Sequence, residues 1–143
     1  MPSLERAYGF RGAAIALGMA TIAGGVQGVL AWQFDFVVLK IAIALAGALV
    51  LVMAGAISAR RSLVKAMTLG CMMAVSFFIA RWVGWSLMQG GFPLTIELFT
   101  QSPLDWPSWM DAQGVSGFWI LEATSMFVPA LFGCFVGQER AAA

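Results

Sequence analysis

The charged residues that stand within or beside long apolar segments are the first candidates for chemistry: Arg81, Glu122, Lys40 and Glu97. A charge near the centre of a bilayer costs roughly 2.5 to 3.5 kcal/mol on insertion scales, so a membrane protein keeps one only where it is paired, hydrated or used. At about 1.5 Å of rise per residue, Arg81 lies about 10 Å, Glu122 about 9 Å and Lys40 about 6 Å below the outer ends of their helices. The sequence therefore predicts that these three side chains converge in the outer leaflet, with Glu97 as a further member of an intramembrane polar cluster.

The predicted polar cluster has two interpretations. In the first, Arg81 and Glu122 form an interhelical ion pair that fixes how their helices dock, while Lys40 extends to the outer surface. In the second, the cluster lines a pocket that opens outward and holds an anionic headgroup, a small solute or a proton. The inner half of each apolar segment offers hydroxyls and thiols but no further carboxylate, which disfavours a conduction path. The ion pair is the favoured interpretation.

Catalytic and metal chemistry find little support in the residue types. The sequence has no histidine, which excludes a Ser-His-Asp relay, a histidine-based metal site and bis-histidine haem ligation. Asp105 and Asp111 have no recognisable metal spacing. Cys71 and Cys134 lie within apolar runs, which favours buried structural thiols over redox centres. We therefore expect a protein that is not an enzyme, with no metal site and no cofactor of its own.

The elements that must position these residues are transmembrane helices. Hydrophobic residues make up 61% of the 143 positions and charged residues 10%, and the mean hydropathy is +0.88, whereas soluble domains contain roughly 45 to 50% apolar residues. Apolar runs of about 20 residues can cross a bilayer as helices and are too continuous for barrel strands. The sequence predicts a single domain over residues 1–143, an all-α integral membrane four-helix bundle with spans at about 12–31, 36–59, 63–88 and 116–137.

The connection between the last two predicted spans, residues 89–115, differs from an ordinary loop. Gly90 and Gly91 interrupt the helical pattern, and Pro93 can then open a new helical turn. This pattern predicts a short interfacial helix between spans three and four. Tryptophans gather near the same surface, which is typical of an aromatic belt at headgroup level, with a ligand-stacking site as the alternative: Trp32, Trp82, Trp85, Trp106, Trp109 and Trp119.

The basic residues indicate the orientation. Those that flank the spans all fall before span one, between spans two and three or after span four: Arg6, Arg11, Arg60, Arg61, Lys65 and Arg140. The long connection on the other side carries acidic residues and no Lys or Arg. The positive-inside rule therefore predicts a multi-pass protein with both termini in the cytoplasm.

Small residues recur on the predicted helix faces. Such residues let two backbones approach closely where packing, rather than the hydrophobic effect, holds helices together. We expect contacts within the bundle, with contacts to a partner's helices as the alternative. The candidate packing glycines are Gly18, Gly24, Gly25, Gly28, Gly47 and Gly55.

One stretch of the chain resembles a known family. Arg81-Trp82-Val83-Gly84, then Gly90-Gly91-Phe92-Pro93, then Glu97-Leu98 at the end of the third span resembles a family of small four-helix bacterial membrane proteins of unknown function. The resemblance covers spans three and four and their connection. It implies a bacterial inner-membrane protein and brings no activity with it.

Two classes of function remain. The favoured one is a non-enzymatic accessory or assembly subunit, which packs Gly/Ala helix faces and an aromatic outer surface against other subunits of a larger bacterial membrane complex. The alternative is a small transporter, channel or lipid-binding protein built around Arg81, Glu122 and Lys40. Membrane lipids are expected contacts in either case, and a lipid or pigment held jointly with a partner stays open. A net charge of +1 with no basic block gives no basis for binding nucleic acid.

Overall fold

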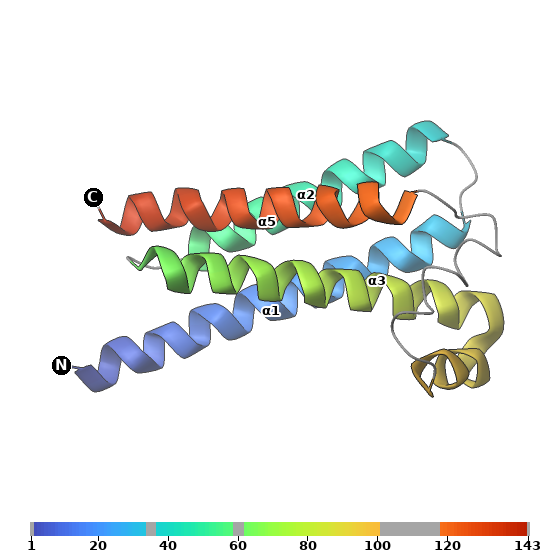
Figure 1. Ribbon diagram of the computed structural model, residues 1–143, viewed down its shortest axis with the longest axis horizontal. Helices are drawn as coiled ribbons and strands as arrows, with labels where there is room; N and C mark the ends of the chain where they lie inside the picture. Colours follow the sequence, from blue (N-terminus) through green and yellow to red (C-terminus); the bar gives the residue numbers. More distant parts are fainter. Residues whose placement is uncertain (1, 34–36, 59–61, 101–117, 143) are drawn as a thin grey trace.

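The computed structural model describes residues 2–33, 37–58, 62–100 and 118–142. All of these residues except Ser62 are helical, and the helices pack side by side along one common direction (Figure 1). The helices are α1 (Pro2–Gln33), α2 (Val37–Ser58), α3 (Leu63–Thr100) and α5 (Phe118–Ala142). The all-α prediction is confirmed for this part of the chain, and the described residues of all four predicted spans are helical.

Three of the helices are long and apolar enough to cross a membrane. Within the described residues, the candidate crossings are Phe10–Leu30, Ile41–Ser58 and Leu63–Met88. The third has the bounds that the sequence predicts. Helix α1 begins ten residues before its predicted span, at Pro2, because proline is well suited to a first helical position and no further proline follows before Gly12. The structure therefore supports a helical membrane protein.

Glycines bring the helices together as two close pairs. A Cβ atom added to Gly24 or Gly28 of α1 would collide with the backbone carbonyls of Phe77 and Arg81 on α3. Within the second pair, a Cβ on Gly55 of α2 would lie 2.7 Å from the backbone nitrogen of Cys134 on α5. Helix α1 also has its most extensive contacts with α3, and α2 with α5, whereas α2 and α3 scarcely touch. The α1/α3 and α2/α5 pairs are thus the close contacts, and α1 meets α2 more loosely.

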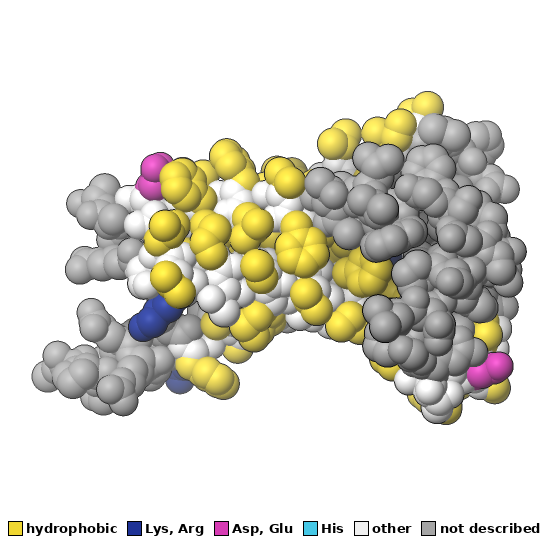
Figure 2. Space-filling model, viewed as in Figure 1, with side chains coloured by type: hydrophobic (Ala, Val, Ile, Leu, Met, Phe, Trp, Pro, Cys, Tyr) yellow, Lys and Arg dark blue, Asp and Glu magenta, His cyan; other side chains and the backbone are white. Residues whose placement is uncertain are grey.

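The core between the helices is small and apolar. Its fully buried residues include Leu51, Met73, Phe77 and Cys134, and alanines from all four helices pack among them. Large hydrophobic side chains instead point outward, for example Ile57, which is 74% exposed. Figure 2 shows such side chains covering the middle of the bundle, which is the surface expected to face lipid.

Helix α3 is sharply kinked at Gly91, and its last turns fold back toward its own span. Gly91 has φ 71° and ψ −163°, a combination that is essentially restricted to glycine, and Pro93 opens the helical segment that follows. The hydroxyl oxygens of Ser86 and Thr95 lie 3.0 Å apart across this kink. The predicted break and the short helix after it are therefore present.

The folded-back segment changes the expected position of one tryptophan. Trp82 is only 3% exposed, and the ring of Phe99 packs edge-on against it with 5.3 Å between ring centroids. We expected Trp82 on the outer aromatic surface, but the segment after Gly91 covers it. The prediction of two buried thiols is confirmed for Cys134 and wrong for Cys71, which is exposed. An apolar run does not show which of its faces points inward.

The two ends of the bundle differ in charge. The N-terminus, the C-terminus and the start of α3 lie at one end (Figure 1). Among the described side chains, the exposed basic residues Arg11, Lys65 and Arg140 belong to these helix ends, with Glu139 beside them. Exposed Glu97 follows the kink at the other end.

Candidate functional site

The predicted intramembrane polar cluster is described only in part. Arg81 lies half-buried on α3, and Glu97 is exposed on the segment after Gly91. The side chains of Lys40 and Glu122 lie outside the described part of the structure, although their backbones belong to α2 and α5. The convergence of these charges, and the transporter function built on it, therefore stays a prediction.

The backbone around Arg81 is fixed against α1. A Cβ on Gly28 would meet the carbonyl oxygen of Arg81 and lie 3.0 Å from the backbone nitrogen of Trp85, and a Cβ on Gly84 would lie 2.6 Å from the carbonyl oxygen of Gly25. Contacts this close leave neither helix free to rotate or slide without separating the pair. The backbone of Arg81 therefore has a fixed position along α1.

The candidate packing glycines have different surroundings. Gly24, Gly28 and Gly55 serve contacts inside the bundle, and Gly47 faces Gln27. A Cβ added to Gly18 or Gly25 would meet nothing within 4 Å, although the carbonyl oxygen of Gly25 touches Gly84. The small residues are thus used largely for internal packing, and Gly18 is left on the outer surface of α1.

The candidate interfacial aromatics are also only partly described. Trp82 is buried and Trp85 is half-buried. Trp106 and Trp109 lie outside the described residues, as do the side chains of Trp32 and Trp119. An outer aromatic surface therefore stays a prediction for those four residues.

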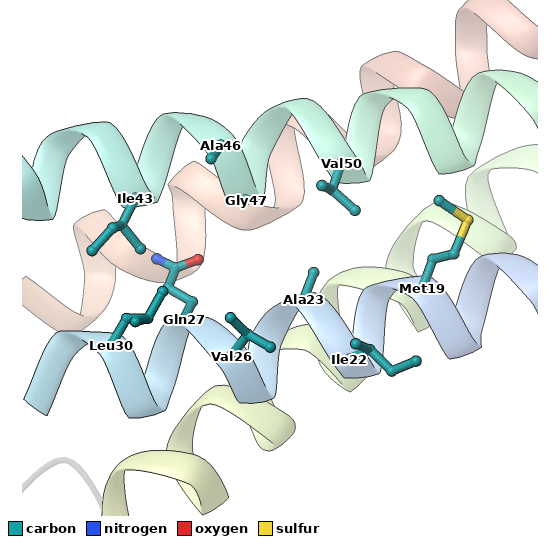
Figure 3. Close-up of a pocket in the computed structure, with 10 residues that line it drawn as sticks. All are labelled: Met19, Ile22, Ala23, Val26, Gln27, Leu30, Ile43, Ala46, Gly47 and Val50. Carbon is teal, nitrogen blue, oxygen red and sulfur yellow. The ribbon is translucent and has the colours of Figure 1, made fainter.

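A groove of about 420 Å³ lies between α1 and α2 (Figure 3). Its volume lies within the range of small-molecule sites and is too large for side-chain packing defects. The α1–α2 groove is lined by Met19, Ile22, Ala23, Val26, Gln27 and Leu30 of α1, and by Ile43, Ala46, Gly47 and Val50 of α2. All of these except Gln27 and Gly47 carry apolar side chains, so Gln27 is the polar group of the groove.

Gln27 is buried and incompletely satisfied. Its side chain reaches from α1 toward α2 beside Gly47 (Figure 3), and it is only 8% exposed. Within the described part of the structure, its carbonyl oxygen Oε1 accepts no hydrogen bond. A Cβ on Gly47 would lie 2.5 Å from Oε1 and 3.0 Å from Cζ of Phe77, so only glycine leaves room for the amide. A buried acceptor without a donor costs about 1 to 3 kcal/mol, which makes this oxygen the strongest unmet polar demand in the groove.

The sequence contains one signal for this site, a glutamine inside the apolar run of α1, and the structure shows which way that glutamine faces. Gln27 lies seven and eleven residues after Ala20 and Ala16, both fully buried, so all three share one face of α1. A glutamine on the inward face of an apolar helix, about 5 Å from the end of the candidate crossing at Leu30, is a polar group that needs a partner. Charged residues are the more obvious candidates in a sequence because their transfer into lipid costs more free energy than that of an amide.

The described residues offer little else for ligand chemistry. Within the residues that the structure describes, no group of three or more Cys, Asp and Glu side chains is placed to hold a metal ion. The α1–α2 groove is apolar, and Oε1 of Gln27 is buried beside Gly47, so a donor in the groove reaches this oxygen only if the Gln27 side chain turns toward it. The groove suits a hydrophobic occupant.

Comparison with known proteins adds no relative. No family model matches the chain, and neither the curated proteins nor the solved structures give a match. Any function must therefore be argued from the α1–α2 groove and the surfaces of the helices themselves.

Proposed function

We propose that the chain is a four-helix membrane bundle of the bacterial inner membrane with both termini in the cytoplasm, and that it serves as a non-enzymatic accessory or assembly subunit of a larger membrane complex. In this role it receives a transmembrane helix of another subunit in the α1–α2 groove. The observation that carries the proposal is Oε1 of Gln27, which is buried and accepts no hydrogen bond within the described residues, in an otherwise apolar groove. A helix that presents a hydroxyl or amide donor would satisfy it once the Gln27 side chain turns toward the groove.

The energetic argument depends on the lipid environment. Lipid tails fill apolar grooves but donate no hydrogen bond, so a lipid-filled groove would leave Oε1 unsatisfied. Hydrogen bonds between membrane helices contribute about 0.6 to 2 kcal/mol each, enough to select one register among several similar ones. A Ser, Thr or Asn side chain on a partner helix therefore provides specificity, while apolar contacts with Ile22, Val26 and Ile43 provide area.

The dimensions of the groove also suit a helix. From Met19 to Leu30, α1 rises by about 17 Å, or about three helical turns. Ala23, Ala46 and Gly47 are the small residues along its walls, and they allow another backbone to approach closely. Nothing in the groove suggests a reaction, which is why a docking role is favoured over catalysis.

The test uses the full chain, tagged and extracted from its own bacterial membrane in a mild detergent, and measures co-purifying membrane subunits by native mass spectrometry. Ala46→Phe fills the groove, and Ala44→Phe makes the same change at an exposed position of α2 outside it. Gln27→Leu removes the acceptor at similar volume, and Gln33→Leu repeats that change at an exposed position of α1. We expect a stoichiometric partner that is lost in Ala46→Phe, weakened in Gln27→Leu and retained in both controls.

Gln27→Leu also separates docking from folding. Without its partner, the isolated variant should be as stable as the wild type or more stable, because the substitution removes a buried acceptor that has no donor among the described residues. Reduced partner binding together with unreduced stability would show that Gln27 acts in association. A monomer without any co-purifying subunit, or a partner that ignores Ala46→Phe, would refute the proposal.

A further inference from the structure

A second cavity of about 300 Å³ lies at the other end of α1, where that helix meets the start of α3 and the end of α2. Its polar rim consists of Ser58, Lys65 and Thr68, and its apolar wall includes Leu17, Leu69 and Met72. We call it the Lys65 pocket. It lies at the end of the bundle that holds both chain termini (Figure 1) and is separate from the α1–α2 groove.

The polar and apolar parts of the Lys65 pocket follow the axis of α3. Lys65 is the third residue of the helix, whereas Met72 lies about 14 Å along the helix from its first residue, Leu63. The charged rim is therefore at the helix end and the apolar wall extends into the candidate crossing Leu63–Met88. This gradient matches a phospholipid, whose headgroup stays at the surface while its acyl chain runs along the helices.

The hydrogen-bonding groups of the rim favour an anion. The hydroxyl of Thr68 donates to the carbonyl oxygen of Val64 at 2.8 Å, so its proton is already used. Lys65 and Ser58 remain as donors, and within the described residues Lys65 forms no ion pair. Exposed Arg11 and Arg140 lie at the same end of the bundle, and although Glu139 offsets one of them, the described side chains there carry a net positive charge. A basic pocket between membrane helices on the cytoplasmic side is a known setting for phospholipid headgroups.

We propose that the Lys65 pocket binds one anionic phospholipid, with its phosphate against the Lys65 ammonium and the Ser58 hydroxyl and one acyl chain along Leu17, Leu69 and Met72. The occupant is a lipid rather than a free phosphate ion because more than half of the wall consists of apolar side chains. The site rests on the proposed orientation, with this end of the bundle in the cytoplasm, but not on the accessory role, since it shares no residue with the α1–α2 groove.

The test titrates the purified full chain in neutral detergent with dioleoylphosphatidylglycerol and, separately, with dioleoylphosphatidylcholine, and measures bound lipid by native mass spectrometry. Lys65→Gln removes the charge, and Lys65→Arg keeps it. Arg140→Gln removes one positive charge at the same end but outside the pocket. One basic group near a membrane surface contributes about fivefold to the binding of an anionic lipid. We therefore expect Lys65→Gln to weaken phosphatidylglycerol binding by about fivefold or more, while Lys65→Arg and Arg140→Gln stay within about twofold of the wild type.

Three results would overturn the lipid site. The first is equal affinity for the anionic and the zwitterionic lipid, and the second is an equal loss in Arg140→Gln and Lys65→Gln, which would indicate general surface charge. The third is inorganic phosphate displacing the lipid at equal concentration, which would make the acyl wall irrelevant. Helicity by circular dichroism checks that Lys65→Gln is folded, as expected for an exposed side chain.

Discussion

The hydroxyl groups of Ser86 and Thr95 meet across the kink of α3, with 3.0 Å between their oxygens and nine residues between them in sequence. Each hydroxyl also lies within hydrogen-bonding distance of a backbone carbonyl, that of Val83 for Ser86 and that of Gly91 for Thr95. Both residues are buried. This network joins the folded-back segment to the helix it leaves, and it does so where little water can compete.

Thr95→Val should lower the free energy of unfolding by about 1 kcal/mol, because it keeps the shape of the side chain and removes the hydroxyl from a buried pair. Reversible unfolding in mixed micelles, followed by circular dichroism, measures the change. Thr100→Val is the control, since Thr100 is exposed and its hydroxyl donates to the nearby carbonyl of Glu97. The control should stay within about 0.5 kcal/mol of the wild type. An equal loss in both variants would show that the pair across the kink is unimportant.

Gly91→Ala should destabilise the protein by about 1 to 3 kcal/mol, because an L-residue rarely adopts φ 71° with ψ −163°. The variant should also expose Trp82, since an alanine favours a straight continuation of α3 and draws Phe99 away from the indole. Acrylamide quenching of tryptophan fluorescence measures the exposure. Unchanged stability and unchanged quenching would mean that the kink does not require glycine.

Gly28→Ala should destabilise the α1/α3 pair by about 1 to 3 kcal/mol or more, because the new methyl group would meet the Arg81 carbonyl and neither backbone can turn aside. Gly18→Ala on the same helix meets nothing within 4 Å and should be neutral or stabilising by up to about 1 kcal/mol. Unfolding in mixed micelles compares the two. If both variants lose stability equally, backbone flexibility rather than close packing explains the effect.

The two thiols should differ in reactivity toward N-ethylmaleimide in detergent. Cys71 is exposed, whereas Cys134 is buried and must wait for local opening, so Cys71 should react faster by on the order of tenfold or more. In Cys71→Ser the fast phase should vanish, and in Cys134→Ser it should remain. Equal rates for the two thiols would contradict the packing of α5 against α2.

The sequence predicts the helices well because their signals are local. The long apolar run ending at Met88 and the Gly91-Phe92-Pro93 stretch locate the third crossing and the kink after it. Both depend on the preferences of residues close in sequence, namely the length of apolar runs, the conformations open to glycine and the place of proline at a helix start.

The pairing of helices could not be predicted in the same way. A helix that is apolar on every side does not indicate which face is buried. The sequence therefore predicts an exposed Trp82 and a buried Cys71, whereas in the structure Trp82 is buried and Cys71 is exposed. The burial of Gln27 could not be predicted for a related reason: Gly47 and Phe77, which enclose its amide, lie on other helices. The charges at Lys40 and Glu122 are predicted to converge from helix face and depth, and these two quantities do not determine whether two side chains meet.

The two close helix pairs interleave along the chain, and this has a consequence for synthesis. Helix α1 finds its glycine-mediated partner in α3, and α2 finds its own in α5, so neither pair joins consecutive helices. When α1 and α2 have emerged from the ribosome, each still lacks its principal partner, and α2 lacks its partner until the last helix has been made. A nascent chain stalled before Phe118 therefore exposes the surface of α2 around Gly55. This surface, which α5 covers in the complete bundle, would distinguish the incomplete chain for membrane chaperones and proteases.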